Sequence, residues 1–337
     1  MRPLYTQEKI SWKGGNAGLW YDKFCNQWEP DWSGLGDDGK KEWIKTVTGK
    51  VGHQSQLETT NTRLADFLKA HNQQPLFFKN TYTFVTGLGR EHPVENGFAW
   101  HHTLGVPYLP GSSVKGMVRA WAKQWDPKPD EEINRIFGPK EGDLRVGSVI
   151  FLDALPTCPV ELQADIMTPH YGPYYQDDKG QTPPADWHSP TPILFLAVSK
   201  EQSFVFGLLP RREKDRADCQ QVENWLRDAL CWIGAGAKTA VGYGRFERDE
   251  EYQSTTAAKA EAQVISIKKA IQNLRGAQDR NRLPEIVANI AQLQDLQDRK
   301  VCATMLLQWF KQHRKNKKLK ELLNSDKPWT KQLKSWI

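Results

Sequence analysis

Two serines, a lysine and an arginine follow a Pro-Gly pair in the stretch GVPYLPGSSVKGMVRAWA, residues 105–122. Pro-Gly is typical of a turn, and either serine can cap the first exposed amides of a helix. Valine and tryptophan then recur at helical spacing, which predicts a helix over 113–125. Free amides, hydroxyls, Lys115 and Arg119 at one helix start suit a phosphate. The plainer interpretation is a capped helix whose basic residues are solvated.

A second candidate site is the glycine-rich run GAGAKTAVGYGRF, residues 234–246. Glycine lets other atoms approach the backbone closely, and successive amides in such turns form concavities that bind anions. Ala237 and Trp232 stand where a phosphate-binding P-loop needs glycine, so nucleotide hydrolysis is not predicted. The alternative interpretation is a tight connection between a helix and a strand.

Metal chemistry has one candidate group, in a long loop rich in proline and tyrosine. Asp165, His170, Asp186 and His188 lie there and are close enough in sequence to converge on an ion. Loop histidines are more often hydrogen-bonded surface residues than ligands. We therefore expect no metal and no other cofactor.

Acid–base cleavage of RNA is the other chemistry that the histidines allow. His101, His102 or His170 could pair with Lys115 to move protons, as a metal-independent ribonuclease requires. His101 and His102 are adjacent and diverge on a regular element, so they do not form a ligand pair. Nothing in their spacing requires catalysis, and this activity stays an alternative.

Hydrophobic patterning predicts an α+β domain that positions these motifs. The expected elements alternate as strand, helix, strand, strand, helix and strand, with strands at 81–86, 149–151, 193–198, 204–209 and 241–246 and the second helix at 218–232. This order indicates a ferredoxin-like, or RRM-like, split βαβ fold with long insertions. We expect a domain over 1–250, with an N-terminal helical segment and an inserted loop at 156–192.

Residues 251–337 differ from the rest of the chain and are expected to form an all-helical extension. Three apolar stripes at helical spacing run through them without any strand signal. From residue 252 they contain 17 Lys and Arg against 7 Asp and Glu, on a chain of net charge +6. This excess indicates a polyanionic partner or a solvated basic surface. Its densest part is the run Arg314, Lys315, Lys317, Lys318 and Lys320.

The cysteines and the lack of long apolar segments indicate a location. Five scattered cysteines without a C-x-x-C pair favour reduced thiols over disulfides or a zinc ribbon. No stretch approaches the ~20 apolar residues that a membrane span needs, and the first residues resemble no secretory signal. We expect a cytoplasmic protein with no membrane partner.

Together these motifs resemble the RAMP (repeat-associated mysterious protein) superfamily of CRISPR systems. The pairing of PYLPGSSVKGMVRAW with the late loop GAGAKTAVGYGRF carries the resemblance. The segments VTGLGREHPVENGFAWHHTLGVPYLPGSSVKG and MTPHYGPYY…PPADWHSPTPILFLAV are similar to the family of sixth subunits of the Cmr complex, the type III-B effector. NAGLWYDKF near the N-terminus fits the same family. The resemblance extends over about residues 15–247.

The resemblance implies a prokaryotic, non-catalytic RNA-binding subunit of a ribonucleoprotein complex in antiviral defence. Such subunits cap the backbone of RAMP proteins near the 3′ part of the guide (crRNA), beside target RNA and other RAMP subunits. The implied guide contacts are Arg90, Gly111, Ser112, Ser113, Lys115, Arg119, Gly236, Lys238, Thr239, Gly242, Gly244 and Arg245. Further RNA or subunit contacts are expected at His101, His102, His170, Tyr171, Trp187 and His188.

Two alternative functions remain open at this point. The chain could instead process the precursor of the guide as an endoribonuclease, or serve as a protein-only cap without RNA contact. The helical extension lies outside the resemblance. It could replace the small helical subunit of such complexes, dock a neighbour, or pack as a simple extension.

Overall fold

The computed structural model describes residues 12, 14–36, 38–139, 145–190, 192–293, 295–313 and 315–336. The chain divides into two compact units. Unit 1 consists of Met1–Asn61 and Pro75–Asp249, and unit 2 consists of Thr62–Gln74 and Glu250–Ile337. Unit 2 therefore includes a segment, Thr62–Gln74, that the predicted boundary at residue 250 assigns to the first domain.

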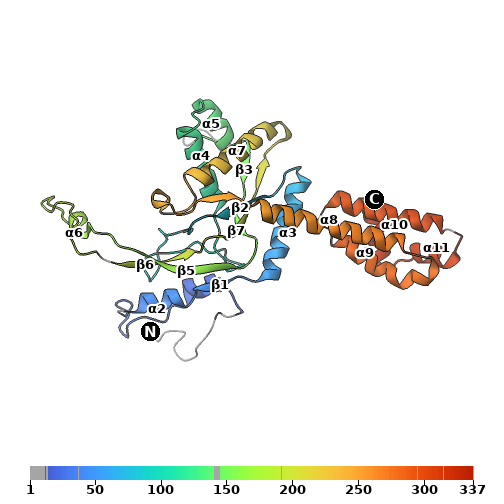
Figure 1. Cartoon of the computed structure of the whole chain (residues 1–337), viewed down its shortest axis with the longest axis horizontal. Helices are drawn as coiled ribbons and strands as arrows, with labels where there is room; N and C mark the ends of the chain where they lie inside the picture. The colour runs from blue at the N-terminus through green and yellow to red at the C-terminus, as the bar shows by residue number, and fades with distance from the viewer. Residues whose placement is uncertain are drawn as a thin grey trace. The chain divides into compact units, whose positions relative to one another are not determined.

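Unit 1 is built on a four-stranded antiparallel sheet with the order β4–β7–β2–β9. Its strands are β2 (Leu76–Asn80), β4 (Leu155–Pro156), β7 (Ser203–Phe206) and β9 (Phe246–Arg248). Helix α4 (Gly111–Gln124) follows β2, and helix α7 (Arg216–Trp232) follows β7. The two helices pack together on one side of the sheet (Figure 1). This βαββαβ order, with the two central strands flanked by the second and fourth, confirms the ferredoxin-like prediction.

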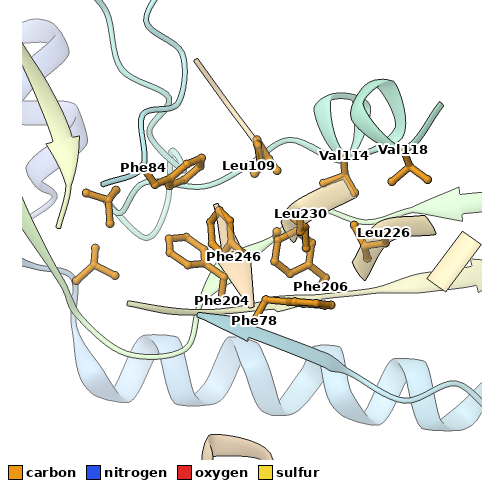
Figure 2. Packing of buried hydrophobic residues seen from close by; sticks show 14 of the residues in the cluster. Phe78, Phe84, Leu109, Val114, Val118, Phe204, Phe206, Leu226, Leu230 and Phe246 are labelled. Atoms are coloured by element: carbon orange, nitrogen blue, oxygen red, sulfur yellow. The ribbon is translucent and has the colours of Figure 1, made fainter. Parts of the chain in front are cut away.

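The core lies between the sheet and these two helices. Phenylalanines from three strands meet there, with Phe78 and Phe206 packed edge to face at 5.4 Å between ring centroids. Figure 2 shows the sheet residues below the aliphatic side chains of α4 and α7, namely Val114, Val118, Leu226 and Leu230. The apolar positions of α4 recur every three to four residues, so this helix buries one face and leaves Ser112, Ser113 and Gly116 outside.

A second antiparallel sheet carries a long arm. Its order is β1–β5–β6, with β1 at Gly49–Val51, β5 at Val160–Met167 and β6 at Ile193–Val198. The arm leaves this hairpin with the short helix α6 (Gly172–Tyr175) near its end (Figure 1). The predicted inserted loop at 156–192 is thus wrong in part, because β5 pairs with β6 over six residues. Many residues of β5 are exposed, so the strand has no continuous apolar run, and the prolines that follow it in sequence favour a loop.

Two predicted strand boundaries are also wrong. The strand predicted at 81–86 contributes only a bridge between Phe84 and Val198. The buried Asn80 side chain donates hydrogen bonds to the carbonyls of Tyr82 (2.7 Å) and Ser199 (2.8 Å), which ends β2 in a turn. The final strand begins only at Phe246, because the glycine loop before it adopts left-handed backbone.

The other elements of unit 1 complete its surface. They are α1 (Ala17–Lys23), α2 (Gly39–Lys45), the start of α3 (Gln54–Ala70), α5 (Asp130–Phe137) and the two-stranded sheet of β3 (Val149–Phe151) with β8 (Leu208–Pro210). Helix α5 packs on α4. Asn134 of α5 and Gly138 after it both accept hydrogen bonds from Arg119 of α4.

Unit 2 is helical throughout its described part, as predicted for the extension. Its helices are α8 (Glu250–Gln272), α9 (Leu283–Ala291), α10 (Leu296–Gln312), α11 (Lys317–Leu323) and α12 (Pro328–Ser335). They surround a core of their own, which includes Ile271, Val287, Leu306 and Leu333. Among the described residues of the whole chain, no helix combines the length and the apolarity needed to cross a membrane.

Candidate nucleic-acid interface

The start of α4 is capped by a side chain that the sequence did not indicate. The helix begins at Gly111, and neither serine caps it. Instead the Asp153 carboxylate accepts a hydrogen bond from the Gly111 amide at 2.7 Å. The expectation that this helix end is free for an anion is therefore wrong at its first amide. A negative charge already satisfies that position.

One side of α4 forms a wall of a groove of about 540 Å³. Three segments that are distant in sequence meet around it, together with Leu109: the TGLG segment at 86–89, the α4 residues Ser113, Gly116 and Met117, and the glycine loop. The loop contributes Ile233, Gly234, Gly236, Ala237 and Thr239. The structure thus brings the two predicted anion-binding segments to one place. None of these lining residues is charged, so the groove itself offers amides, hydroxyls and room for close approach.

Gly116 is one of several lining residues that the sequence-based set did not include. It lies inside α4, where glycine costs about 1 kcal/mol relative to alanine. A Cβ atom built on Gly116 meets no atom within 4 Å, so the fold does not require its absence. A glycine that weakens its helix and faces an open groove is expected where a ligand lies against the backbone. Gly116 lies three residues after Ser113 and therefore on the same face of the helix. This spacing was the signal available in the sequence.

The glycines of the late loop are required for a different reason. At Gly236 and Gly244 an added Cβ would collide with the carbonyl oxygens of Val85 and Ala235, and both glycines have positive φ. The sequence suggested that these glycines leave room for a polyanion. In the structure, the packing of the chain itself already requires glycine at both positions. Gly242 differs, because a Cβ there would meet open space, although its φ of +99° also favours glycine.

Lys238 lies in this loop but outside the groove lining. Its ammonium nitrogen is 5.5 Å from the ring centroid of Phe195 and 5.9 Å from that of Tyr243. The Tyr243 hydroxyl donates to Asp165 at 2.7 Å, which fixes the ring. Burial, reinforced by Asp165, raises the pKa of Tyr243 far above its usual range, so the ring stays neutral below the charge of Lys238.

Three cations gather on the flank of α4. Arg119 donates to the carbonyl of Gly138 (3.0 Å) and to Oδ1 of Asn134 (3.1 Å), and its buried Nε has no hydrogen-bond partner among the described residues. Arg211 donates a hydrogen bond from Nε to the carbonyl of Gly147 at 2.8 Å. Burial lowers the pKa of Lys115, and the charges of Arg119 and Arg211 lower it further.

We call Lys115, Arg119 and Arg211 the cation cluster. Within the described part of the chain none of the three forms an ion pair with a carboxylate. Arrangements of like charge cost stability unless an anion relieves them, so the cluster is a candidate phosphate site. Arg211 was absent from the sequence-based set, because it follows β8 and reaches the cluster only through the fold.

The other predicted guide contacts are dispersed. Ser112 and Ser113 are exposed at the start of α4, and Thr239 lines the groove. Arg90 is exposed just after the TGLG segment. Arg245 is half-buried, with an Nη1 atom that has no partner among the described residues.

The histidine pair does not assemble with the lysine that the nuclease alternative requires. His101 accepts from the Leu104 amide at Nδ1 (3.3 Å), and its ring meets Tyr108 edge to face. Burial lowers the pKa of His101. His102 is exposed. In the described ranges no side-chain contact joins either histidine to Lys115.

The arm holds the remaining aromatic and histidine candidates, mostly exposed. The Tyr171 hydroxyl donates to Asp186 at 3.1 Å, and His188 contacts the Pro183 carbonyl at 3.1 Å. Trp187 is 77% exposed, and His170 is exposed as well. Over the described residues no group of three potential ligands is placed to hold a metal ion. In unit 2, Lys315, Lys317, Lys318 and Lys320 are exposed, whereas Arg314 lies outside the described residues.

Comparison with known proteins completes the description. The model of the RAMP superfamily matches residues 69–247. The chain is 33% identical over 228 residues to the CRISPR system Cmr subunit Cmr6 of Pyrococcus furiosus, covering 50% of this chain and 66% of that protein. It is 29% identical over 158 residues to the Cmr6 subunit of Saccharolobus solfataricus, covering 45% of this chain and 49% of that protein. The chain thus spans between half and two thirds of these relatives.

Two solved structures are similar as well. One is a type III-B Cmr-beta complex bound to cognate target RNA, at 24% identity and a TM-score of 0.47, covering 62% of this chain and 70% of the matched chain. The other is Cmr6 from Pyrococcus furiosus, at 30% identity and a TM-score of 0.34, covering 52% of this chain and 96% of that one. Because both TM-scores are below 0.5, the assignment rests on the sequence match. On that match, which includes the α4 motif and the glycine loop, the chain belongs to the RAMP superfamily.

Proposed function

We propose that the chain is a non-catalytic, RNA-binding subunit of a type III-B CRISPR effector complex. Its sequence similarity to Cmr6 subunits supports membership of such a complex. The observation that carries the RNA-binding role is the convergence of the TGLG segment, α4 and the glycine loop around one groove, with the cation cluster on the flank of the same helix.

The RNA backbone is the proposed ligand. A guide carries a different spacer each time, so contacts that read bases would restrict its use, whereas phosphate contacts hold any sequence. The groove offers backbone amides and hydroxyls, and the cation cluster offers charge without a competing carboxylate. We place the contact near the 3′ part of the guide, with the chain capping a backbone of RAMP subunits, in line with the family resemblance.

Copurification from the native host tests the assembly. A tagged full-length chain is expected to recover other RAMP subunits together with short RNAs that share one repeat-derived end. Recovery of the chain alone would contradict membership of the complex. Recovery with long precursor RNA, followed by metal-independent cleavage that His101→Ala abolishes, would replace the proposal by the endoribonuclease alternative.

The RNA contact itself is tested on the isolated chain. Replacing Lys115 and Arg211 by glutamine should weaken the binding of unrelated guide-length RNAs to a similar extent. Arg227 and Lys123, which are exposed and paired with Asp228 and Asp130, give a control variant with the same loss of charge. Unchanged binding by the first variant would favour a protein-only cap.

A further inference from the structure

Unit 2 carries a charged surface that the proposed function does not explain. The match to the RAMP superfamily ends at residue 247, before α8 begins. The helices of unit 2 have their own core, so their surface is not needed to complete the RAMP fold. A role for this surface must be argued from its own residues.

Five exposed lysines follow one another at the end of α10 and in α11. We call this set the lysine patch: Lys311, Lys315, Lys317, Lys318 and Lys320. Within the described part of unit 2 none of them pairs with a carboxylate. Other cations of the same unit do, since Lys69 lies 3.9 Å from Asp295 and Lys331 lies 3.2 Å from Asp326. The positive charge of the patch is therefore left uncompensated.

The patch borders a groove of about 700 Å³, lined by Lys311, Gln312, His313, Lys315 and Asn316. Each of these lining residues is polar, and none is acidic. Oδ1 of Asn316 accepts from the amides of Lys318 (3.1 Å) and Leu319 (3.4 Å). His313 is held by the Trp309 carbonyl at 2.9 Å and by the Trp309 ring at 4.6 Å. These contacts hold two of the lining residues in place beside the two lysines of the groove.

Two of the lysines stand where they do not stabilise their helix, whereas Lys311 and Lys320 lie in last turns, where the helix dipole favours cations. Lys317 and Lys318 stand in the first turn of α11, where the helix dipole disfavours cations. A first turn without an acidic residue and with two lysines is the opposite of what a solitary helix favours. An external anion would offset this cost.

We propose that the lysine patch and its groove are a second RNA-binding site, which holds phosphates of a single strand. A protein partner is less well matched, because lysine is depleted in protein interfaces and the described residues that line the groove include no aromatic or aliphatic residue. Lysine ammonium groups along a groove are what a phosphate backbone requires. This site goes beyond the proposed function, because it lies in the other unit and uses none of the groove or cluster residues of unit 1.

The test compares two triple variants of the full-length chain with single-stranded RNA of unrelated sequences as the probe. The patch variant replaces Lys311, Lys315 and Lys317 by glutamine. The control replaces three other exposed lysines of unit 2, Lys259, Lys269 and Lys300, so that the loss of charge is equal. Circular dichroism melting checks that both remain folded.

The patch variant should lower the slope of log affinity against log salt by about 2, since each lost phosphate contact on a single strand removes ~0.7. The control should leave the slope nearly unchanged. Acetylation footprinting should show that RNA protects the patch lysines of the wild-type chain and not the control lysines. Equal slopes for the two variants, or no protection at the patch, would overturn the proposal. A patch variant that keeps RNA affinity but loses copurifying subunits would assign the surface to an acidic protein.

A failure of this proposal is distinguishable from a failure of the function proposed for unit 1. The unit 1 variant with Lys115 and Arg211 replaced leaves the patch intact, and the patch variant leaves the cation cluster intact. If both sites bind RNA, combining the variants should remove more of the salt dependence than either alone. If only the patch variant weakens RNA binding, the RNA site proposed in unit 1 is wrong and the site proposed at the lysine patch is supported.

Discussion

The Asp153 carboxylate and the Gly111 amide are joined by a hydrogen bond of 2.7 Å, which closes the first position of α4. This contact decides where an anion can bind. The helix end that the sequence presents as a phosphate site already holds a negative charge. We therefore propose that RNA binds along the helix, at the groove by Gly116 and at the cation cluster.

Removal of this cap should destabilise the protein. Asp153→Ala is expected to lower the free energy of unfolding of unit 1 by about 1 kcal/mol, because the first amide of α4 loses its partner. Urea unfolding followed by tryptophan fluorescence measures the change. Asp178→Ala, at an exposed acidic position of the arm, removes the same charge without a cap. Equal stability of the two variants would contradict the capping role.

Gly116→Ala should separate stability from function. The added methyl group fills open space, so the helix should gain about 0.5–1 kcal/mol while the groove loses room for the RNA backbone. We expect a higher melting temperature together with weaker RNA binding. Gly172→Ala, which also adds a methyl group in open space but on the arm, should leave RNA affinity unchanged. An alanine variant with full affinity would show that nothing binds against Gly116.

The pKa of Lys115 reports on the cation cluster. Burial and the charges of Arg119 and Arg211 lower this pKa in the folded state. The unfolded chain therefore binds more protons just below the usual lysine range, and the stability should rise as the pH increases through that window. Arg211→Gln should raise the pKa of Lys115 and flatten this rise.

Competitive acetylation across alkaline pH measures this effect directly. Lys123 on the same helix serves as the internal reference, and saturating RNA should also raise the pKa of Lys115 because phosphate stabilises the charged form. If RNA leaves the labelling of Lys115 unchanged, no phosphate binds at the cluster.

Two variants of Lys238 distinguish its side chain from its backbone. Lys238 has a φ of +61°, a conformation that favours glycine. Lys238→Gly should therefore be more stable than Lys238→Ala by about 1 kcal/mol, although both lose the contact with the Phe195 and Tyr243 rings. If the ammonium binds RNA, both variants should lose the same affinity in a filter-binding assay. A loss in only one of them would assign the effect to the loop backbone.

The sequence was sufficient for the fold class and for the helices α4 and α7, because their apolar faces mark which sides are buried. It was not sufficient for every strand, since β2, β4 and β5 were not predicted. It was sufficient also to select the α4 motif and the glycine loop, since serine, glycine and basic residues in such turns suit anions. That RNA binds there remains a prediction. The glycines at 236 and 244 also have a packing reason that the sequence does not show, because their neighbours are backbone carbonyls that only the fold brings close.

Asp153 and Arg211 could not be found from the sequence alone. Each follows a strand of the two-stranded sheet β3–β8 and reaches α4 across the fold. A single sequence contains no record of such long-range contacts. The same holds for β5, which pairs with β1 far earlier in the chain and with β6 beyond the arm.

The central claim is that the cation cluster in unit 1 holds RNA through its phosphates. The most direct measurement is the salt dependence of binding for several unrelated single-stranded RNAs, with the wild-type chain and a variant in which Lys115, Arg119 and Arg211 are glutamine. The account predicts a parallel loss of affinity for every sequence and a slope reduced by about 2. An unchanged slope, or a loss restricted to one sequence, would contradict it.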